Sequence, residues 1–258
     1  MFKWISINWL MFLMLTILFS QVFSQIQDRN NSVAKTLSVG FNLISQQTAY
    51  FNRQINLSDY DPEPTFGRAI GISLRYSPGN KYFFQLEGLN SFQGQKYSYS
   101  QPEKDTAGNV TSVFLYSRSF ELNYFKFPIL AGVVLNLNKK VQVQIGLGPQ
   151  FSYLNTAYYI LDADTLIRKD RSFKQTLRKI DTGLALFFGI RTRIIKGLFF
   201  QTSLRSDFSL LDAESIRYKP VSYASSKNFT GGISFGLSWD FSWITQSCKK
   251  KPNPENGG

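Results

Sequence analysis

The amino-acid sequence predicts an all-β fold: an eight-stranded antiparallel transmembrane up-and-down β-barrel with long external loops and short periplasmic turns. Residues 229–243 alternate between large apolar residues or glycine and small or polar ones. This stretch is long enough to cross a bilayer at a tilt, whereas strands of soluble proteins usually run about five or six residues. Long and short connections follow one another in turn, as in outer-membrane barrels. The mean hydropathy is only -0.17 although 16% of the residues are aromatic, because apolar residues alternate with polar ones.

Residues 36–45 and 67–77 are the first two predicted strands. The first has Leu, Val, Phe and Leu at alternate positions, and the second alternates Ile, Leu and Tyr with small residues and Arg75. The polar residues 46–66 between them predict a long loop. A Pro-Gly-Asn sequence at 78–80 predicts a tight turn.

Residues 81–99 and 113–137 are the third and fourth predicted strands, separated by a polar loop. In the fourth, the alternation slips near residues 124–127, and Pro128 cannot donate to a ladder. A β-bulge is therefore predicted there. Residues 138–140, Asn-Lys-Lys, predict the second tight turn.

The second half of the chain repeats the same alternation. Its predicted elements are, in order, strand 141–156, loop 157–178, strand 179–195, turn 196–197, strand 198–211, loop 212–227 and strand 229–243. The even number of strands places both ends of the barrel on one side of the membrane. Because the short turns lie on that side, both termini are expected in the periplasm, with the barrel in the cell outer membrane.

The chain outside the barrel divides into three parts. Residues 1–24 read as a secretory signal peptide, since the apolar core is short for a spanning helix, although a retained helical anchor is the alternative. Residues 25–35 are a periplasmic segment, residues 36–243 the barrel, and residues 244–258 a flexible basic periplasmic tail. Cys248, the sole cysteine, is either a free thiol or a link between chains.

Charged residues on the inward-facing positions are the candidate site. They are Arg75, Glu87, Glu121, Lys126, Asp181, Arg191, Arg193, Arg205, Asp207 and Asp240. An eight-stranded barrel is just wide enough for side chains to fill it, and buried charges must pair. A lumen charge network that plugs the barrel is predicted; an ion path or small-ligand pocket and a catalytic carboxylate are the alternatives.

At the end of the last strand, Trp239, Phe241 and Trp243 predict an aromatic belt at the membrane interface. The formal net charge of +12 would suggest nucleic acid. A secreted barrel does not meet nucleic acid, so the expected partners are outer-membrane lipid, lipopolysaccharide and other envelope proteins.

The sequence contains no histidine. This excludes the His-dependent triads of outer-membrane hydrolases and His-ligated metal sites, and one cysteine cannot form a thiolate zinc site. We therefore expect no catalytic residue, no metal and no cofactor. The acidic loop clusters match no defined calcium site and are expected to be solvated.

Three motifs, residues 123–130 (NYFKFPIL), 146–154 (GLGPQFSYL) and 181–183 (DTG), resemble the PorT-like outer-membrane barrel family of the Bacteroidota. The resemblance extends over nearly the whole barrel and implies the same fold. One branch of that family works with the type IX secretion and gliding machinery. The predicted function is a non-enzymatic structural or accessory subunit of a cell-envelope assembly; a small-solute transport or ligand-binding barrel is the alternative.

Overall fold

The computed structural model describes residues 35–51, 61–104, 110–136, 140–163, 166–170, 172–215 and 225–243. The predicted signal peptide, the basic tail and Cys248 lie outside these residues. Within them, no helix is both long and apolar enough to cross a membrane.

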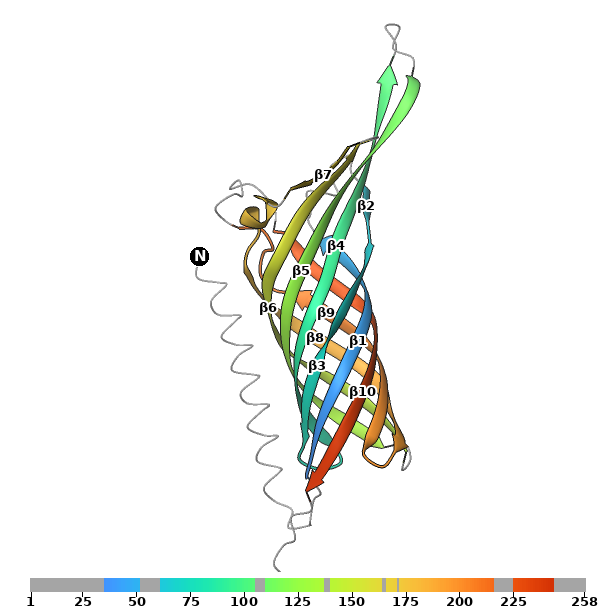
Figure 1. Ribbon diagram of the computed structural model, residues 1–258, viewed down its shortest axis with the longest axis vertical. Helices are drawn as coiled ribbons and strands as arrows, with labels where there is room; N and C mark the ends of the chain where they lie inside the picture. The colour runs from blue at the N-terminus through green and yellow to red at the C-terminus, as the bar shows by residue number, and fades with distance from the viewer. Residues whose placement is uncertain are drawn as a thin grey trace, which may run out of the picture.

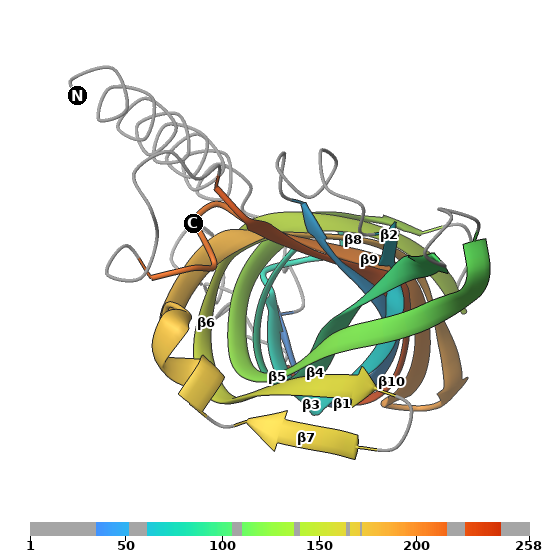
Figure 2. The ribbon, with the colours of Figure 1, turned by 90° about the horizontal axis from the view of Figure 1, so that it is seen from above.

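Eight strands form a closed antiparallel barrel in which each strand pairs with its neighbours in sequence order (Figures 1 and 2). They are β1 (Lys35–Phe51), β3 (Thr65–Ser77), β4 (Tyr82–Lys104), β5 (Val110–Asn136), β6 (Val141–Ala163), β8 (Ile180–Ile195), β9 (Leu198–Ser209) and β10 (Lys227–Trp243). The pairing of β1 with β10 closes the barrel. The predicted fold class is confirmed.

The register fixes the shape of the barrel. Starting at Leu37 on β1, one can step from each residue to its cross-strand partner on the next strand until the circuit returns to β1 at Gln47. The residues passed are Tyr76, Phe84, Ala131, Leu147, Leu186, Ser206 and Gly231. One circuit therefore shifts the chain by ten residues (47 − 37). Strands with such a stagger tilt by about 35–45° from the barrel axis, and the interior of an eight-stranded barrel is just wide enough for side chains to fill it.

The two ends of the barrel differ. At the turn end lie the start of β1, the end of β10 and the connections 78–81, 137–140 and 196–197. At the loop end lie the connections 52–64, 105–109, 164–179 and 210–226.

The loop end contains more strand than the sequence predicted. The strands β4 and β5 continue to residues 104 and 110 and rise above the rest of the barrel (Figure 1), so a predicted loop is largely a β-ribbon. The short strand β2 (Asp61–Glu63) pairs with β4, and β7 (Leu166–Asp170) pairs with β6. A 3-10 helix, η2 (Ser172–Thr176), follows β7.

The strand β2 is tied to β4 by side chains as well as backbone. Lys96 Nζ lies 3.3 Å from Glu63 Oε2, and the Ser98 hydroxyl donates to the same carboxylate. These two contacts, Ser98 first, lower the pKa of Glu63. They add to the backbone pairing that holds β2 against β4.

The bulge predicted in the fourth strand lies close to its expected position but on the other strand. The register between β5 and β6 shifts at Asn123/Tyr124, where Asn123 pairs with Thr156 and Tyr124 with Leu154. The extra residue is Asn155 of β6. The strand β5 keeps one alternation of buried and more exposed residues from Leu122 to Leu130. Because the bulge was predicted on the wrong strand, the direction in which Glu121 faces was also predicted wrongly, as described below.

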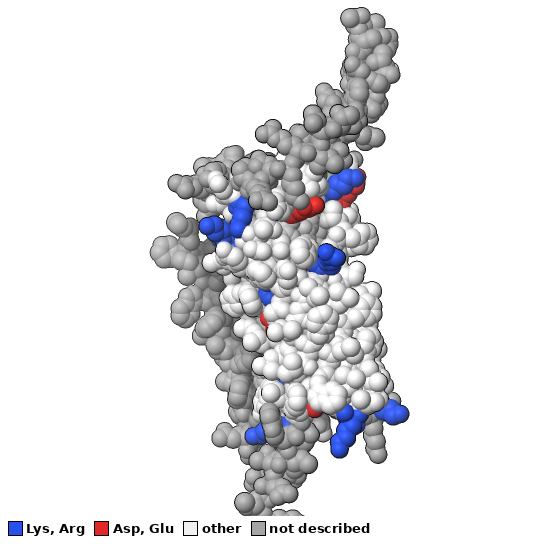
Figure 3. All heavy atoms as spheres, in the orientation of Figure 1, with Lys and Arg blue, Asp and Glu red and all other residues white. Residues whose placement is uncertain are grey.

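Outward-facing side chains form a broad apolar surface around the barrel. Every strand contributes, for example Phe41, Ile72, Phe127, Phe188 and Phe235, all exposed. In Figure 3 most of the blue and red side chains of the described residues lie toward the two ends, with a largely white band between them. A soluble monomer rarely exposes so large an apolar surface, whereas a barrel in lipid requires it.

Candidate functional site: the polar lumen

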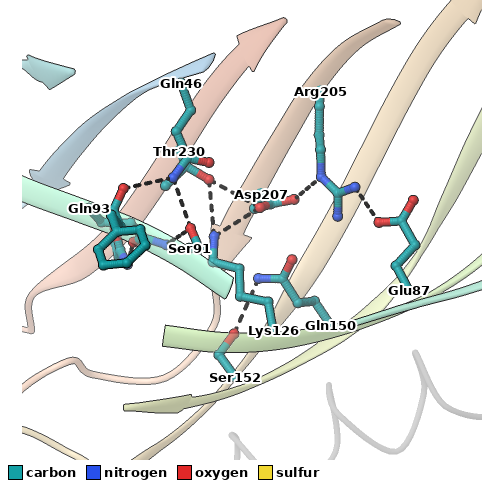
Figure 4. Close-up of polar contacts among 12 residues, drawn as sticks. Gln46, Glu87, Ser91, Gln93, Lys126, Gln150, Ser152, Arg205, Asp207 and Thr230 are labelled. Atoms are coloured by element: carbon teal, nitrogen blue, oxygen red, sulfur yellow. Dashed lines mark hydrogen bonds and ion pairs between the residues drawn. The ribbon is translucent and has the colours of Figure 1, made fainter. Parts of the chain in front are cut away.

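The centre of the lumen holds a chain of ion pairs (Figure 4). Lys126 Nζ of β5 lies 2.9 Å from Asp207 Oδ2 of β9. Arg205, also on β9, places its Nε 3.1 Å from Asp207 Oδ1. The Arg205 guanidinium also binds Glu87 of β4. The Thr230 hydroxyl donates to Asp207 Oδ2 at 3.1 Å. All five side chains are buried, so the pairs are strongly coupled and little screened.

These contacts run across the barrel. The strand β9 pairs only with β8 and β10, so its bonds to Lys126 on β5 and Glu87 on β4 must cross the lumen. The same holds for Asn228 of β10, whose Nδ2 donates to Gln93 Oε1 of β4 at 2.6 Å. Cross-lumen bonds occupy the space through which a solute would pass.

Toward the turn end, a second layer contains Arg75 and Arg191. Arg191 binds Asp240 through both carboxylate oxygens, with NH1 3.2 Å from Oδ2, and it donates to Ser238 Oγ at 3.0 Å. Its guanidinium carbon lies 3.8 Å from the centroid of the Phe199 ring. Arg75 of β3 donates across the lumen to Gln144 Oε1 of β6 at 2.7 Å.

Toward the loop end, one carboxylate, Asp181, is followed by uncharged side chains. Asp181 accepts a hydrogen bond from Ser209 Oγ at 2.7 Å. Beyond it, the Gln46 amide donates to Ser91 Oγ at 2.8 Å, and Gln93 donates to the same hydroxyl at 3.0 Å. Gln46, Ser91 and Gln93 carry no formal charge, so the search for inward-facing charges missed them, and Gln46 also falls in the predicted loop 46–66. All three are buried inside the barrel.

The charges of the described lumen balance. Four cations, Arg75, Lys126, Arg191 and Arg205, stand with four carboxylates, Glu87, Asp181, Asp207 and Asp240. Balance is expected because an uncompensated buried charge costs several kcal/mol. In the part of the chain that the structure describes, no three His, Cys, Asp or Glu side chains form a group that could hold a metal ion.

Two residues predicted for the lumen lie elsewhere. Glu121 is exposed on the outer face, because the neighbouring Leu122 and Tyr124 point inward and pack with Leu154. Arg193 is exposed at the turn end, close to the last residue of β8. Its guanidinium carbon lies 5.3 Å from the Phe199 ring centroid. Both predictions were wrong about position.

Apolar clusters flank the polar layers inside the barrel. Near the turn end, Phe83 and Phe187 pack with ring centroids 5.6 Å apart. Near the loop end, Leu122, Tyr124 and Leu154 form a second cluster with Leu177, which follows η2. Sequence alternation assigned the inward face to polar residues and therefore missed these clusters.

Of the predicted aromatic belt, Trp239 and Phe241 are exposed on the outer face at the turn end. The side chain of Trp243 lies outside the described part of the structure. Trp239 also packs against the 196–197 turn, since a Cβ on Gly197 would lie 3.2 Å from its ring.

A closed eight-stranded barrel with an apolar exterior and a side-chain-filled polar interior defines an integral outer-membrane β-barrel protein. The chain belongs to the outer membrane protein beta-barrel domain family, whose model matches residues 20–215. A comparison with curated protein sequences gave no match.

Solved structures similar to this chain include three outer-membrane proteins. Ail, the attachment invasion locus protein of Yersinia pestis, is 14% identical, with 81% of this chain and 99% of that chain covered and a TM-score of 0.38. Neisserial surface protein A is 11% identical, with coverage of 80% and 97% and a TM-score of 0.41. OprG of Pseudomonas aeruginosa is 11% identical, with coverage of 81% and 96% and a TM-score of 0.42.

Proposed function

We propose that this protein is a non-enzymatic structural or accessory barrel of the outer membrane that does not conduct solutes and acts through its surfaces. One observation carries the proposal: ion pairs and amide bonds between non-neighbouring strands cross the lumen, such as Glu87 with Arg205 and Asn228 with Gln93. A barrel closed in this way presents the ribbon of β4 and β5, the outer face and the termini to its partners.

The absence of enzymatic activity is part of the same proposal. The chain has no histidine, and the lumen carboxylates Glu87, Asp207 and Asp240 are engaged by arginine or lysine. A carboxylate held in an ion pair is a poor general base, because protonation would break the pair.

The proposed partners are lipids and envelope proteins. The apolar outer face suits the acyl chains of outer-membrane lipid and lipopolysaccharide. The motifs at residues 123–130 and 146–154 resemble PorT-like barrels. This resemblance supports a place beside a larger envelope assembly, of which a secretion apparatus is one example.

Single-channel recording tests the closed lumen. The purified protein, inserted into planar bilayers with insertion verified by heat-modifiable gel mobility of the recovered sample, should give no conductance steps. Regular steps from the wild-type barrel would overturn the proposal and favour solute transport.

Crosslinking tests the accessory role. The tagged protein would be crosslinked in native outer membranes, purified in mild detergent and its companions identified by mass spectrometry. A stoichiometric envelope protein is the expected result. A solitary barrel would argue against an accessory subunit and favour a purely structural or ligand-binding role.

A further inference from the structure

Arg75 is a buried guanidinium with unusual surroundings. It is 4% exposed, donates from NH1 to Gln144 Oε1, and its guanidinium carbon lies 3.9 Å from the Phe83 ring centroid. Among the described residues, no carboxylate forms a salt bridge with it. A neutral amide and a ring face compensate a buried charge only in part.

The charged side chains that interact electrostatically with Arg75 are Arg191, which repels it, and Asp240, which attracts it. Asp240 is bound through both oxygens by Arg191. This layer of the lumen therefore carries two guanidinium groups and one carboxylate. The fourth lumen carboxylate, Asp181, which makes the total charge of the lumen balance, is not in this layer. It accepts a hydrogen bond from Ser209 and attracts Lys126 electrostatically.

A cavity adjoins Arg75 on the side of β1 and β10. Its walls include Ser38, Gly40, Ser73 and Gly236, and the centre of a water-sized sphere can move within about 10 Å³ of it. Gly40 and Gly236 both face inward. The space exists because these strands place no large side chain beside the guanidinium.

Three buried groups that line this cavity can donate hydrogen bonds and find no acceptor among the described residues. They are Arg75 Nε, Asn42 Nδ2 and Ser38 Oγ. Buried donors without acceptors are rare, and each costs about 1–3 kcal/mol.

We propose that this cavity binds a small monovalent anion, such as chloride, held by Arg75, Asn42 and Ser38. An anion accepts from all three donors and neutralises the surplus positive charge of the layer. A water molecule would accept from two donors at most and would leave the charge uncompensated. The inference concerns only the lumen and is independent of the accessory role proposed above.

Bromide replaces chloride and can be located by its anomalous scattering. Crystals of the detergent-solubilised barrel grown in sodium bromide should show an anomalous peak within hydrogen-bonding distance of Arg75 Nε and Asn42 Nδ2. A cavity without a peak, or bromide only at exposed arginines such as Arg193, would overturn the proposal.

A solution measurement gives a second, independent readout. At constant ionic strength, replacing sodium gluconate by sodium bromide should raise the urea midpoint of the barrel in lipid vesicles, with saturation as the site fills. The dependence should disappear in Asn42→Leu and in Arg75→Met. It should persist in Arg193→Gln, the matched control at the turn end. Equal bromide dependence in Asn42→Leu and wild type would contradict the site, even where Arg75→Met fails to fold.

Discussion

The direction in which a carboxylate faces decides what its neutralisation costs. Glu87 is buried and binds Arg205, whereas Glu121 is exposed on the outer face. Glu87→Gln should lower the free energy of unfolding by about 3 kcal/mol, because it leaves Arg205 incompletely compensated. Glu121→Gln should change it by less than about 0.5 kcal/mol. Urea unfolding in vesicles, followed by tryptophan fluorescence, measures both; equal losses would refute this account of the lumen.

Sequence alternation identified the inward residues but not their partners. It placed Glu87, Arg205 and Asp207 together on the inner face, where the structure also has them. Glu87 and Arg205 are 118 residues apart, however, and their contact depends on the register of the whole ring. Alternation failed at Glu121 because it treats an apolar residue as outward-facing, and Leu122 points inward.

At the level of elements, the turn between β8 and β9 depends on one backbone conformation. Gly197 has φ of 87°, which side chains with a Cβ rarely adopt, and its carbonyl accepts from Asp240 N at 2.7 Å. Gly197→Val should destabilise the barrel by about 1–3 kcal/mol. Lys196→Ala, at the exposed neighbouring position, should be nearly neutral. Urea midpoints of the two variants check this prediction, which fails if both shift equally.

Because the outer face is apolar, a charged substitution on it should lower the free energy of unfolding by an amount that depends on how deep in the bilayer the residue lies. Phe235 is the central residue of β10 and is exposed, and Phe66 lies near the loop end of β3. Phe235→Arg should cost about 2–4 kcal/mol in a bilayer, and Phe66→Arg only about 0–1 kcal/mol. The two variants should be compared by unfolding in vesicles. A similar small cost at both positions would mean that lipid does not cover the middle of β10.

Strand positions followed from the alternation, but strand ends did not. The polar, Pro-containing residues near 102 predicted a loop, yet β4 and β5 remain paired as far as Lys104 and Val110. Outside a membrane, a ribbon needs no apolar face, so alternation gives no signal for it. The bulge was likewise assigned to β5, although its extra residue is Asn155 of β6. Treating Leu122 as outward-facing made the alternation of β5 slip, whereas Leu122 and Tyr124 both point inward.

For the whole molecule, the alternation of short and long connections makes a prediction about orientation. The turns 78–81, 137–140 and 196–197 lie at the same end as Lys35 and Trp243. If that end faces the periplasm, a protease added to intact cells should cut a recognition site inserted at residues 105–109. It should spare one inserted at residues 78–80, because the outer membrane excludes the enzyme. Both inserts should be cut in detergent, which controls for accessibility. Cleavage at residues 78–80 in intact cells would instead place the turn end and both ends of the barrel outside the cell.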